Sequence, residues 1–131
     1  MRYITFDEIV QIHKRMIEVF GGENGIISED AIENCVALPM LHIFGTETNP
    51  TMWLKAATLL LCLANRHPFV DGNKRTAWAA TKIFLFLNGY RLTVSTENGE
   101  GTVIGVVEGT IDTDDLAEWL EANSENLENT G

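Results

Sequence analysis

The feature that most constrains the fold is a segment in the middle of the chain that is apolar on every side. Residues 56–64 carry no charge, and the run Leu-Leu-Leu-Cys-Leu at 59–63 leaves no polar face for a helix. Such a helix has to be surrounded by other elements, and the run is too short to cross a bilayer. It predicts a central helix that begins at Asn49-Pro50 and ends near Arg66.

Amphipathic patterns before this segment supply packing partners. Thr5 and Glu8 form a capping-box pattern, and apolar residues follow at helical spacing until Gly21-Gly22 ends the first helix. His13 lies on the apolar stripe of this helix, and we interpret it as a hydrogen-bonded core histidine. Ser28 is a suitable N-cap for a second helix.

The rest of the chain is also mostly helical by pattern. We expect a fourth helix from Asn73 to Asn88-Gly89, a brief extended stretch, a polar loop over 95–101, a fifth helix over 102–108 and a last one from Asp112 or Thr113 to Glu121. The prediction is an all-α, single-domain bundle of about six helices over residues 1–123. A small flap or hairpin should lie between the second and third helices, and the polar tail, residues 124–131, should fray.

Charge and cysteine content exclude several classes of protein. Nine basic and nineteen acidic residues give a net charge of −10, which excludes general coating of nucleic acid. Cys35 and Cys62 are expected to be buried free thiols, and the residues before the first helix are not expected to form a secretory signal. A cytoplasmic protein that makes no direct contact with nucleic acid or membranes is therefore expected. The tryptophans are expected mainly in the core; they are Trp53, Trp78 and Trp119.

Chemistry is concentrated in residues 66–75, which read Arg-His-Pro-Phe-Val-Asp-Gly-Asn-Lys-Arg. His67 has the imidazole that suits a general base for a hydroxyl. Asp71 is a carboxylate beside anion-binding groups, as a Mg²⁺ ligand shared with phosphates would be. Phe69 is the large apolar residue that can anchor such a loop to the core.

The second half of this run opens a helix. Gly72 permits close approach of the backbone, and the free N–H groups of Asn73, Lys74 and Arg75 would attract phosphate. Four of the nine cations fall within residues 66–82, namely Arg66, Lys74, Arg75 and Lys82. From the residues alone, metal-assisted phosphate chemistry and an ordinary capped surface turn remain about equally open.

Residues 67–75 resemble the signature of the Fic/Doc family, His-x-Phe-x-Asp/Glu-Gly/Ala-Asn-x-Arg. Lys74, the following Thr76-Ala77 and the segment 86–90 resemble the Doc (death-on-curing) branch. Trp78 stands where the Fic adenylyl transferases carry a further arginine, which favours Doc. Gly72, in contrast, is the residue that the Fic branch uses where the best-known Doc has alanine.

The resemblance implies a toxin of a toxin–antitoxin pair that uses ATP and Mg²⁺ to phosphorylate a threonine of elongation factor Tu and so inhibits translation. His67 would be the catalytic base and Asp71 the Mg²⁺ ligand. Gly72, Asn73 and Lys74 would line the anion site, and Arg75 would bind a nucleotide phosphate. Residues 41–48 correspond to a flap that docks the backbone of the target. A Phd-like antitoxin would place an amphipathic helix in an apolar groove.

Three alternatives stay open. Fic-type transfer of AMP to a protein hydroxyl is the first, a catalytically silent binding module the second, and a nuclease toxin the third. The family also has a self-inhibitory pattern, Ser/Thr-x-x-x-Glu-Gly/Asn, and this chain matches it from Thr93, Thr96 and Ser124. We attribute the first two matches to the composition of a polar loop, and the third, with Glu128 and Asn129, to the frayed tail. Self-inhibition is therefore not expected.

Overall fold

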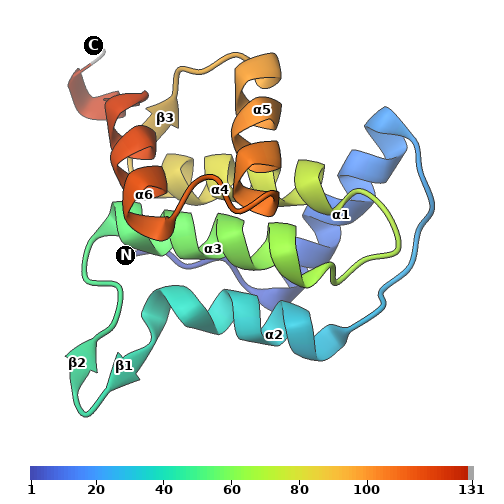
Figure 1. Ribbon diagram of the computed structural model, residues 1–131, viewed down its shortest axis with the longest axis horizontal. Helices are drawn as coiled ribbons and strands as arrows, with labels where there is room; N and C mark the ends of the chain where they lie inside the picture. The colour runs from blue at the N-terminus through green and yellow to red at the C-terminus, as the bar shows by residue number, and fades with distance from the viewer. Residues whose placement is uncertain (130–131) are drawn as a thin grey trace.

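α3 (Met52–Arg66) runs through the middle of the computed structural model, which describes residues 1–129 (Figure 1). Its Leu59, Leu60 and Leu63 side chains are buried, because other helices cover it on several sides. The α-helices of the described chain other than α3 are α1 (Phe6–Phe20), α2 (Glu29–Ala37), α4 (Asn73–Leu87), α5 (Thr96–Val107) and α6 (Thr113–Ala122). The predicted all-α bundle with a central apolar helix is confirmed. Within residues 1–129, no helix has the length and apolar character needed to span a membrane.

Most helix ends follow their capping residues. Thr5 and Glu8 form the reciprocal capping box of α1, and Ser28 and Asp112 accept backbone N–H groups at the starts of α2 and α6. The start of α3 was predicted two residues too early, because Thr51 is the N-cap. Asn49 is buried instead, where its side-chain amide donates a hydrogen bond to the carbonyl of Leu38 (3.1 Å).

The prediction for α5 was wrong by more than a turn. The helix begins at Thr96 rather than at residue 102, and Ser95 accepts the N–H of Asn98 as its N-cap. One of the glycines that suggested a loop serves packing: a Cβ on Gly99 would lie 2.3 Å from Cζ2 of Trp78. Glycine is required here because the indole of Trp78 fills the space of a side chain.

The polar tail is ordered as far as it is described, so the predicted fraying is wrong for residues 124–129. β3 (Tyr90–Leu92) pairs antiparallel with β4 (Ser124–Asn126), with Tyr90 opposite Asn126, and the turn η2 (Leu127–Asn129) follows. Residues 124–126 are therefore paired with an earlier part of the chain. The part of the tail at 130–131 lies outside the described residues.

The predicted hairpin between the second and third helices is present. After the short η1 helix (Leu38–Met40), β1 (His42–Ile43) pairs with β2 (Thr46–Glu47). The buried ammonium of Lys55 donates to the carbonyl of Pro39 (2.9 Å) and to Glu47 (3.1 Å), which attaches the hairpin to the first turn of α3. The hairpin therefore lies at the opposite end of α3 from residue 67, with a helix roughly 22 Å long between them.

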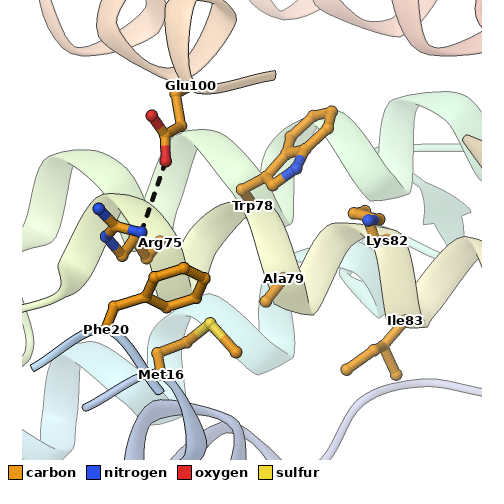
Figure 2. Close-up of a pocket in the computed structure, with 8 residues that line it drawn as sticks. All are labelled: Met16, Phe20, Arg75, Trp78, Ala79, Lys82, Ile83 and Glu100. Atoms are coloured by element: carbon orange, nitrogen blue, oxygen red, sulfur yellow. Dashed lines mark ion pairs between the residues drawn. The ribbon is translucent and has the colours of Figure 1, made fainter. Parts of the chain in front are cut away.

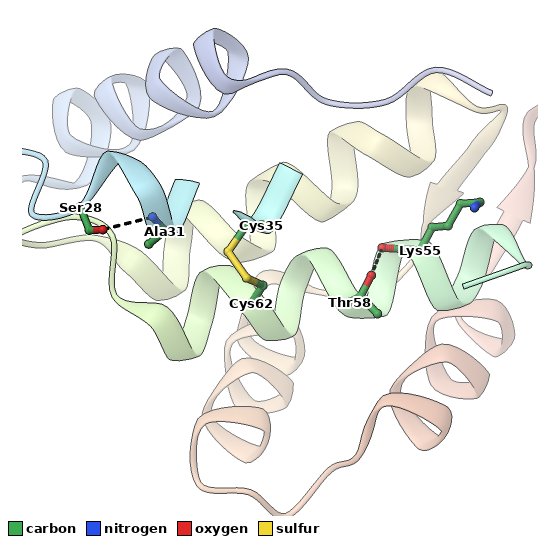
Figure 3. Close-up of a disulfide and its surroundings, with 6 residues drawn as sticks. All are labelled: Ser28, Ala31, Cys35, Lys55, Thr58 and Cys62. Atoms are coloured by element: carbon green, nitrogen blue, oxygen red, sulfur yellow. Dashed lines mark hydrogen bonds between the residues drawn. A yellow bond between two sulfur atoms is a disulfide. The ribbon is translucent and has the colours of Figure 1, made fainter. Parts of the chain in front are cut away.

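The two cysteines form a disulfide, so the prediction of free thiols is wrong. Cys35 of α2 and Cys62 of α3 are bonded, with their Cα atoms 5.4 Å apart (Figure 3). The two cysteines are 27 positions apart in the sequence, and their bond joins helices that pack on each other. A distance of this size lies within the range that a disulfide bridges. Only the packing of α2 on α3 reveals it.

We expect this disulfide to stabilise the fold. A crosslink over 27 positions should contribute about 3.5 kcal/mol to the free energy of unfolding through restriction of the unfolded chain. Urea denaturation with and without a reductant measures this effect. The reductant should lower the midpoint of the parent protein and leave that of a Cys35→Ala/Cys62→Ala variant unchanged. Equal midpoints for the parent under both conditions would contradict the prediction.

The tryptophans pack against the core, as predicted. Trp78 is 6% exposed, and its ring lies 6.1 Å from that of Trp119, which joins α4 to α6. Trp53 contacts the edge of Tyr90, with ring centroids 4.9 Å apart. These contacts tie the C-terminal half of the chain to the central helices.

Candidate active site

The site begins where α3 ends. His67 follows Arg66 as the C-cap, with the left-handed backbone angles φ 48° and ψ 58°. This conformation is uncommon outside glycine and reverses the chain without an extra residue. The His67 side chain is exposed, and no group in residues 1–129 hydrogen-bonds to its ring. Both ring nitrogens therefore lack a hydrogen-bond partner among the described residues.

Phe69 attaches the loop to the core. Its side chain is buried, and its ring stacks on that of His13 from α1, with centroids 3.8 Å apart and planes 4° from parallel. His13 is itself buried, and its Nε2 lies 2.8 Å from the carbonyl oxygen of Asp71. The interpretation of His13 as a hydrogen-bonded core histidine is confirmed.

The side chain of Asn73 joins the start of α4 to Phe69 in the loop. Its side-chain oxygen accepts the N–H of Phe69 (3.0 Å), and its side-chain nitrogen donates to the carbonyl of Phe69 (2.8 Å). The carboxamide pairs with Phe69 as a neighbouring β-strand would. The side chain of Asn73 therefore closes the loop, and its backbone N–H belongs to the uncapped first turn of α4.

The carboxylate of Asp71 is held by backbone groups. One oxygen accepts the N–H of Gly72 (2.8 Å), and the other accepts the N–H of Glu23 (3.3 Å) from the connection between α1 and α2. Gly22 permits this approach: its φ is +117°, and a Cβ there would lie 2.6 Å from the same carboxylate. The carboxylate is thereby fixed, while each of its oxygens retains a lone pair.

This arrangement fits a Mg²⁺ ion that is shared with phosphates. No group of three or more His, Cys, Asp or Glu side chains within the described chain is arranged to hold a metal. Mg²⁺ commonly binds through one or two carboxylates and completes its shell with water and substrate phosphates. Asp71 is the carboxylate available for that role beside the α4 terminus.

The start of α4 forms an anion-binding shape. Gly72 is its N-cap with φ +77°, and no side chain caps the first turn. The backbone N–H groups of Asn73, Lys74 and Arg75 therefore lack acceptors within the helix. They border a cavity of about 320 Å³ whose lining includes all the predicted polar site residues. The lining residues are His67, Val70, Asp71, Gly72, Asn73, Lys74 and Arg75.

Arg75 extends from this cavity toward α5 and α1. Its Nη1 lies 3.6 Å from a carboxylate oxygen of Glu100, and its guanidinium stacks 4.1 Å from the ring centroid of Phe20 (Figure 2). The two charged side chains are 43% and 45% exposed, so the pair contributes little stability. Glu100 belongs to the pattern match that begins at Thr96. Assigning that match to a loop was wrong, because Glu100 lies in a helix that faces the site.

The match that begins at Ser124 lies elsewhere. Ser124 is in β4 and Glu128 follows in η2, next to β3 rather than to the 67–75 loop. The predicted cluster of four cations also divides. Lys74 and Arg75 border the anion cavity, whereas Lys82 lies two turns further along α4 beside an apolar depression.

Sequence reasoning missed one segment beside the site. Ile26 forms an isolated antiparallel bridge with Phe69, supported by hydrogen bonds from Ile27 N–H to the Pro68 carbonyl (2.7 Å) and from Val70 N–H to the Gly25 carbonyl (3.0 Å). The side chains of Ile27 and Val70 are 65% and 47% exposed. Gly-Gly at 21–22 and Gly25 were the available signal, because glycines permit this close backbone pairing.

The match to a known protein family covers the 67–75 loop and most of the helices that hold it. The model of the Fic/DOC family matches residues 3–85, more than half of the chain. The chain belongs to the Fic/DOC family and, by its relatives, to the Doc branch.

Two curated relatives support this assignment. Toxin Doc of Mycolicibacterium smegmatis is 47% identical over 73 residues, which cover 56% of each chain. Protein kinase doc of Escherichia phage P1 is 30% identical over 120 residues, covering 92% of this chain and 94% of that protein. The match to the first relative thus spans only about half of its length, whereas the match to the second spans nearly all of it.

Proposed function

We propose that this protein is a Doc-like toxin that transfers the γ-phosphoryl group of ATP to a hydroxyl of a target protein. The observation that carries the proposal is the exposed, unbonded imidazole of His67 beside the uncapped start of α4 and the fixed carboxylate of Asp71. By resemblance the target is a threonine of elongation factor Tu, and its phosphorylation would inhibit translation.

The chemistry assigns a task to each group. His67 accepts the proton of the target hydroxyl. At the same time the hydroxyl oxygen forms a bond to the γ-phosphorus, and the bond between the γ-phosphorus and the departing ADP breaks. The N–H groups of the first turn of α4, together with Lys74 and Arg75, stabilise the negative charge on the phosphates. Mg²⁺, when bound through Asp71 and the phosphates, supplies further charge neutralisation.

Phosphoryl transfer is favoured over AMP transfer by Trp78. This residue occupies the position of the second arginine of Fic adenylyl transferases, and its indole is buried against α5. An indole in that place supplies no positive charge for a nucleotide phosphate. AMP transfer is the second candidate function, and it is supported by Gly72, the residue that Fic enzymes use at that position.

We infer that the target docks along Gly25–Ile27 rather than on the β1–β2 hairpin. In a bridge of this geometry, the N–H and carbonyl of Ile26 point away from the 67–75 loop, and no described group hydrogen-bonds to them. An extended target segment can pair with such an edge. This edge lies beside Pro68, whereas the hairpin lies at the far end of α3.

A label-transfer assay tests the proposed function. The protein is incubated with Mg²⁺ and a bacterial lysate, with γ-labelled and α-labelled ATP in parallel and a His67→Ala control for each. Label on protein from the γ-phosphate alone supports the kinase, and the size of the band identifies the target for comparison with elongation factor Tu. Label from the α-phosphate supports AMP transfer. Absence of both would overturn the enzyme proposal in favour of a binding module.

The antitoxin is proposed to bind the depression along α4. This depression has a volume of about 280 Å³ and an apolar floor of Met16, Phe20, Ala79 and Ile83, with Arg75 and Lys82 beside it (Figure 2). An amphipathic helix with acidic residues complements both features, and its binding would cover Arg75 of the site. The relative named Toxin Doc supports a toxin–antitoxin pair.

Ile83→Asp should weaken this interaction by at least tenfold, because a carboxylate on the floor of the depression is desolvated when the helix binds. The measurement is the yield of partner that co-purifies with tagged protein from the native host. Ile43→Asp is the matched control, since Ile43 is also exposed but lies in the hairpin. Equal loss for both variants, or no co-purifying partner for a harmless parent protein, would contradict the proposal.

A further inference from the structure

A buried histidine of α1 contacts two different parts of the site loop. His13 is 3% exposed, its ring lies flat on that of Phe69, and its Nε2 is 2.8 Å from the carbonyl oxygen of Asp71. A carbonyl oxygen only accepts hydrogen bonds, so Nε2 carries the hydrogen and donates it. His13 thus contacts the loop at its apolar anchor and at the residue assigned to Mg²⁺.

The hydrogen bond sets the orientation of the peptide between Asp71 and Gly72. A trans peptide is planar, and its carbonyl and N–H point in opposite directions. Because the Asp71 carbonyl points inward to His13, the N–H of Gly72 points outward. There it donates to the carboxylate of Asp71 at 2.8 Å. The direction of the carboxylate is therefore linked to the His13 ring through one rigid peptide plane.

The surroundings of Gly72 restrict the same peptide from the other side. A Cβ on Gly72 would lie 3.2 Å from Cδ1 of Ile17 and 3.7 Å from Nε2 of His13. The backbone of the N-cap thus rests directly on α1. Rotation of the 71–72 peptide would break the bond to His13 and displace the first turn of α4, whose free N–H groups border the anion cavity.

We propose that His13 is a positioning residue for phosphoryl transfer: its Nε2–H orients the Asp71–Gly72 peptide, and through it the Asp71 carboxylate and the anion-binding turn. This inference rests on the proposed function for its kinetic consequence. Its structural part concerns the free protein and stands independently.

Two substitutions separate the hydrogen bond from the packing of the ring. His13→Phe keeps a ring against Phe69 and removes the donor. His13→Gln keeps an N–H donor at a comparable reach and removes the ring stacking. If His13 acts only as core packing, the glutamine variant will be the more impaired in both stability and activity. If it positions the loop, the two measurements will rank the variants in opposite orders.

We expect His13→Gln to have the lower thermal midpoint and to retain most of the kcat of the parent protein. His13→Phe should have the higher midpoint of the two and a kcat reduced by about ten- to hundredfold, as is usual for the loss of a partner of a metal-binding residue. Ile9→Val, a change in the same buried stripe of α1, is the control for general destabilisation. It should lower the midpoint and leave kcat unchanged. Activity that follows stability in all three variants would overturn the proposal.

A spectroscopic measurement separates failure of this proposal from failure of the proposed function. Nitrogen NMR of the unmodified free protein should show the Nε2–H form of His13, and the amide signal of Gly72 should shift in His13→Phe but much less in His13→Gln. These signals need no nucleotide and no target, so they decide the structural part even if the parent protein transfers no label. An unprotonated Nε2, or a Gly72 signal that is unchanged in His13→Phe, would refute the positioning role.

Discussion

Replacing His67 with alanine should lower the rate of γ-phosphoryl transfer to the target by about 10²- to 10⁴-fold, the usual contribution of a positioned general base. The target hydroxyl would then have to lose its proton to water. Nucleotide binding should change little, because the phosphates are assigned to the start of α4 and no hydrogen bond joins the His67 ring to the described groups there. The measurement is the initial rate of label transfer at saturating ATP, with the nucleotide affinity determined separately.

Two further variants make this result interpretable. His67 has a left-handed backbone conformation, which asparagine adopts more readily than alanine. His67→Asn therefore keeps the turn while removing the imidazole, and it should be as inactive as His67→Ala. His42→Asn removes an exposed histidine of the hairpin and should retain full activity. A His67→Asn protein that transfers label at the parent rate would exclude His67 as the base.

Replacing Arg75 with alanine should weaken ATP binding by about ten- to hundredfold, since hydrogen bonds from a charged donor contribute about 1.5–3 kcal/mol. Arg75 borders both the anion cavity and the depression beneath Glu100. Titration calorimetry with a non-hydrolysable ATP analogue and Mg²⁺ measures the effect. Arg15→Ala is the matched control, because it removes an equal charge from an exposed ion pair on α1.

Glu100→Gln should change the affinity in the opposite direction. The carboxylate of Glu100 competes with phosphate for Arg75 across 3.6 Å, and an exposed pair of this kind is worth up to about 1 kcal/mol. Removal of its charge should tighten ATP binding by up to about fivefold.

If Arg75→Ala and Arg15→Ala weaken ATP binding equally, the effect of Arg75 is that of net charge alone. Arg75 would then make no direct contact with the phosphates.

The sequence by itself determined those features that depend on near neighbours in the chain. The capping box of Thr5 and Glu8 and the N-caps Ser28 and Asp112 were predictable because capping bonds join residues three apart. The apolar run at 59–63 predicted the central helix because no face of it can meet water. The loop residues from His67 to Arg75 were predictable as a group because they are contiguous and surround one turn.

Tertiary structure decided everything that depends on which helices meet. The Cys35–Cys62 bond and the insertion of Trp78 at Gly99 each join residues about 20 or more positions apart, and no local pattern encodes such distances. The pairing of Ser124–Asn126 with Tyr90–Leu92 is of the same kind. At the site, the sequence showed a histidine, a carboxylate and four candidate phosphate-binding residues. The packing of α1 and the 25–27 segment on the loop decided the direction of Asp71, the closing role of Asn73 and the contact with His13, because side-chain orientation follows from neighbours that the fold brings together.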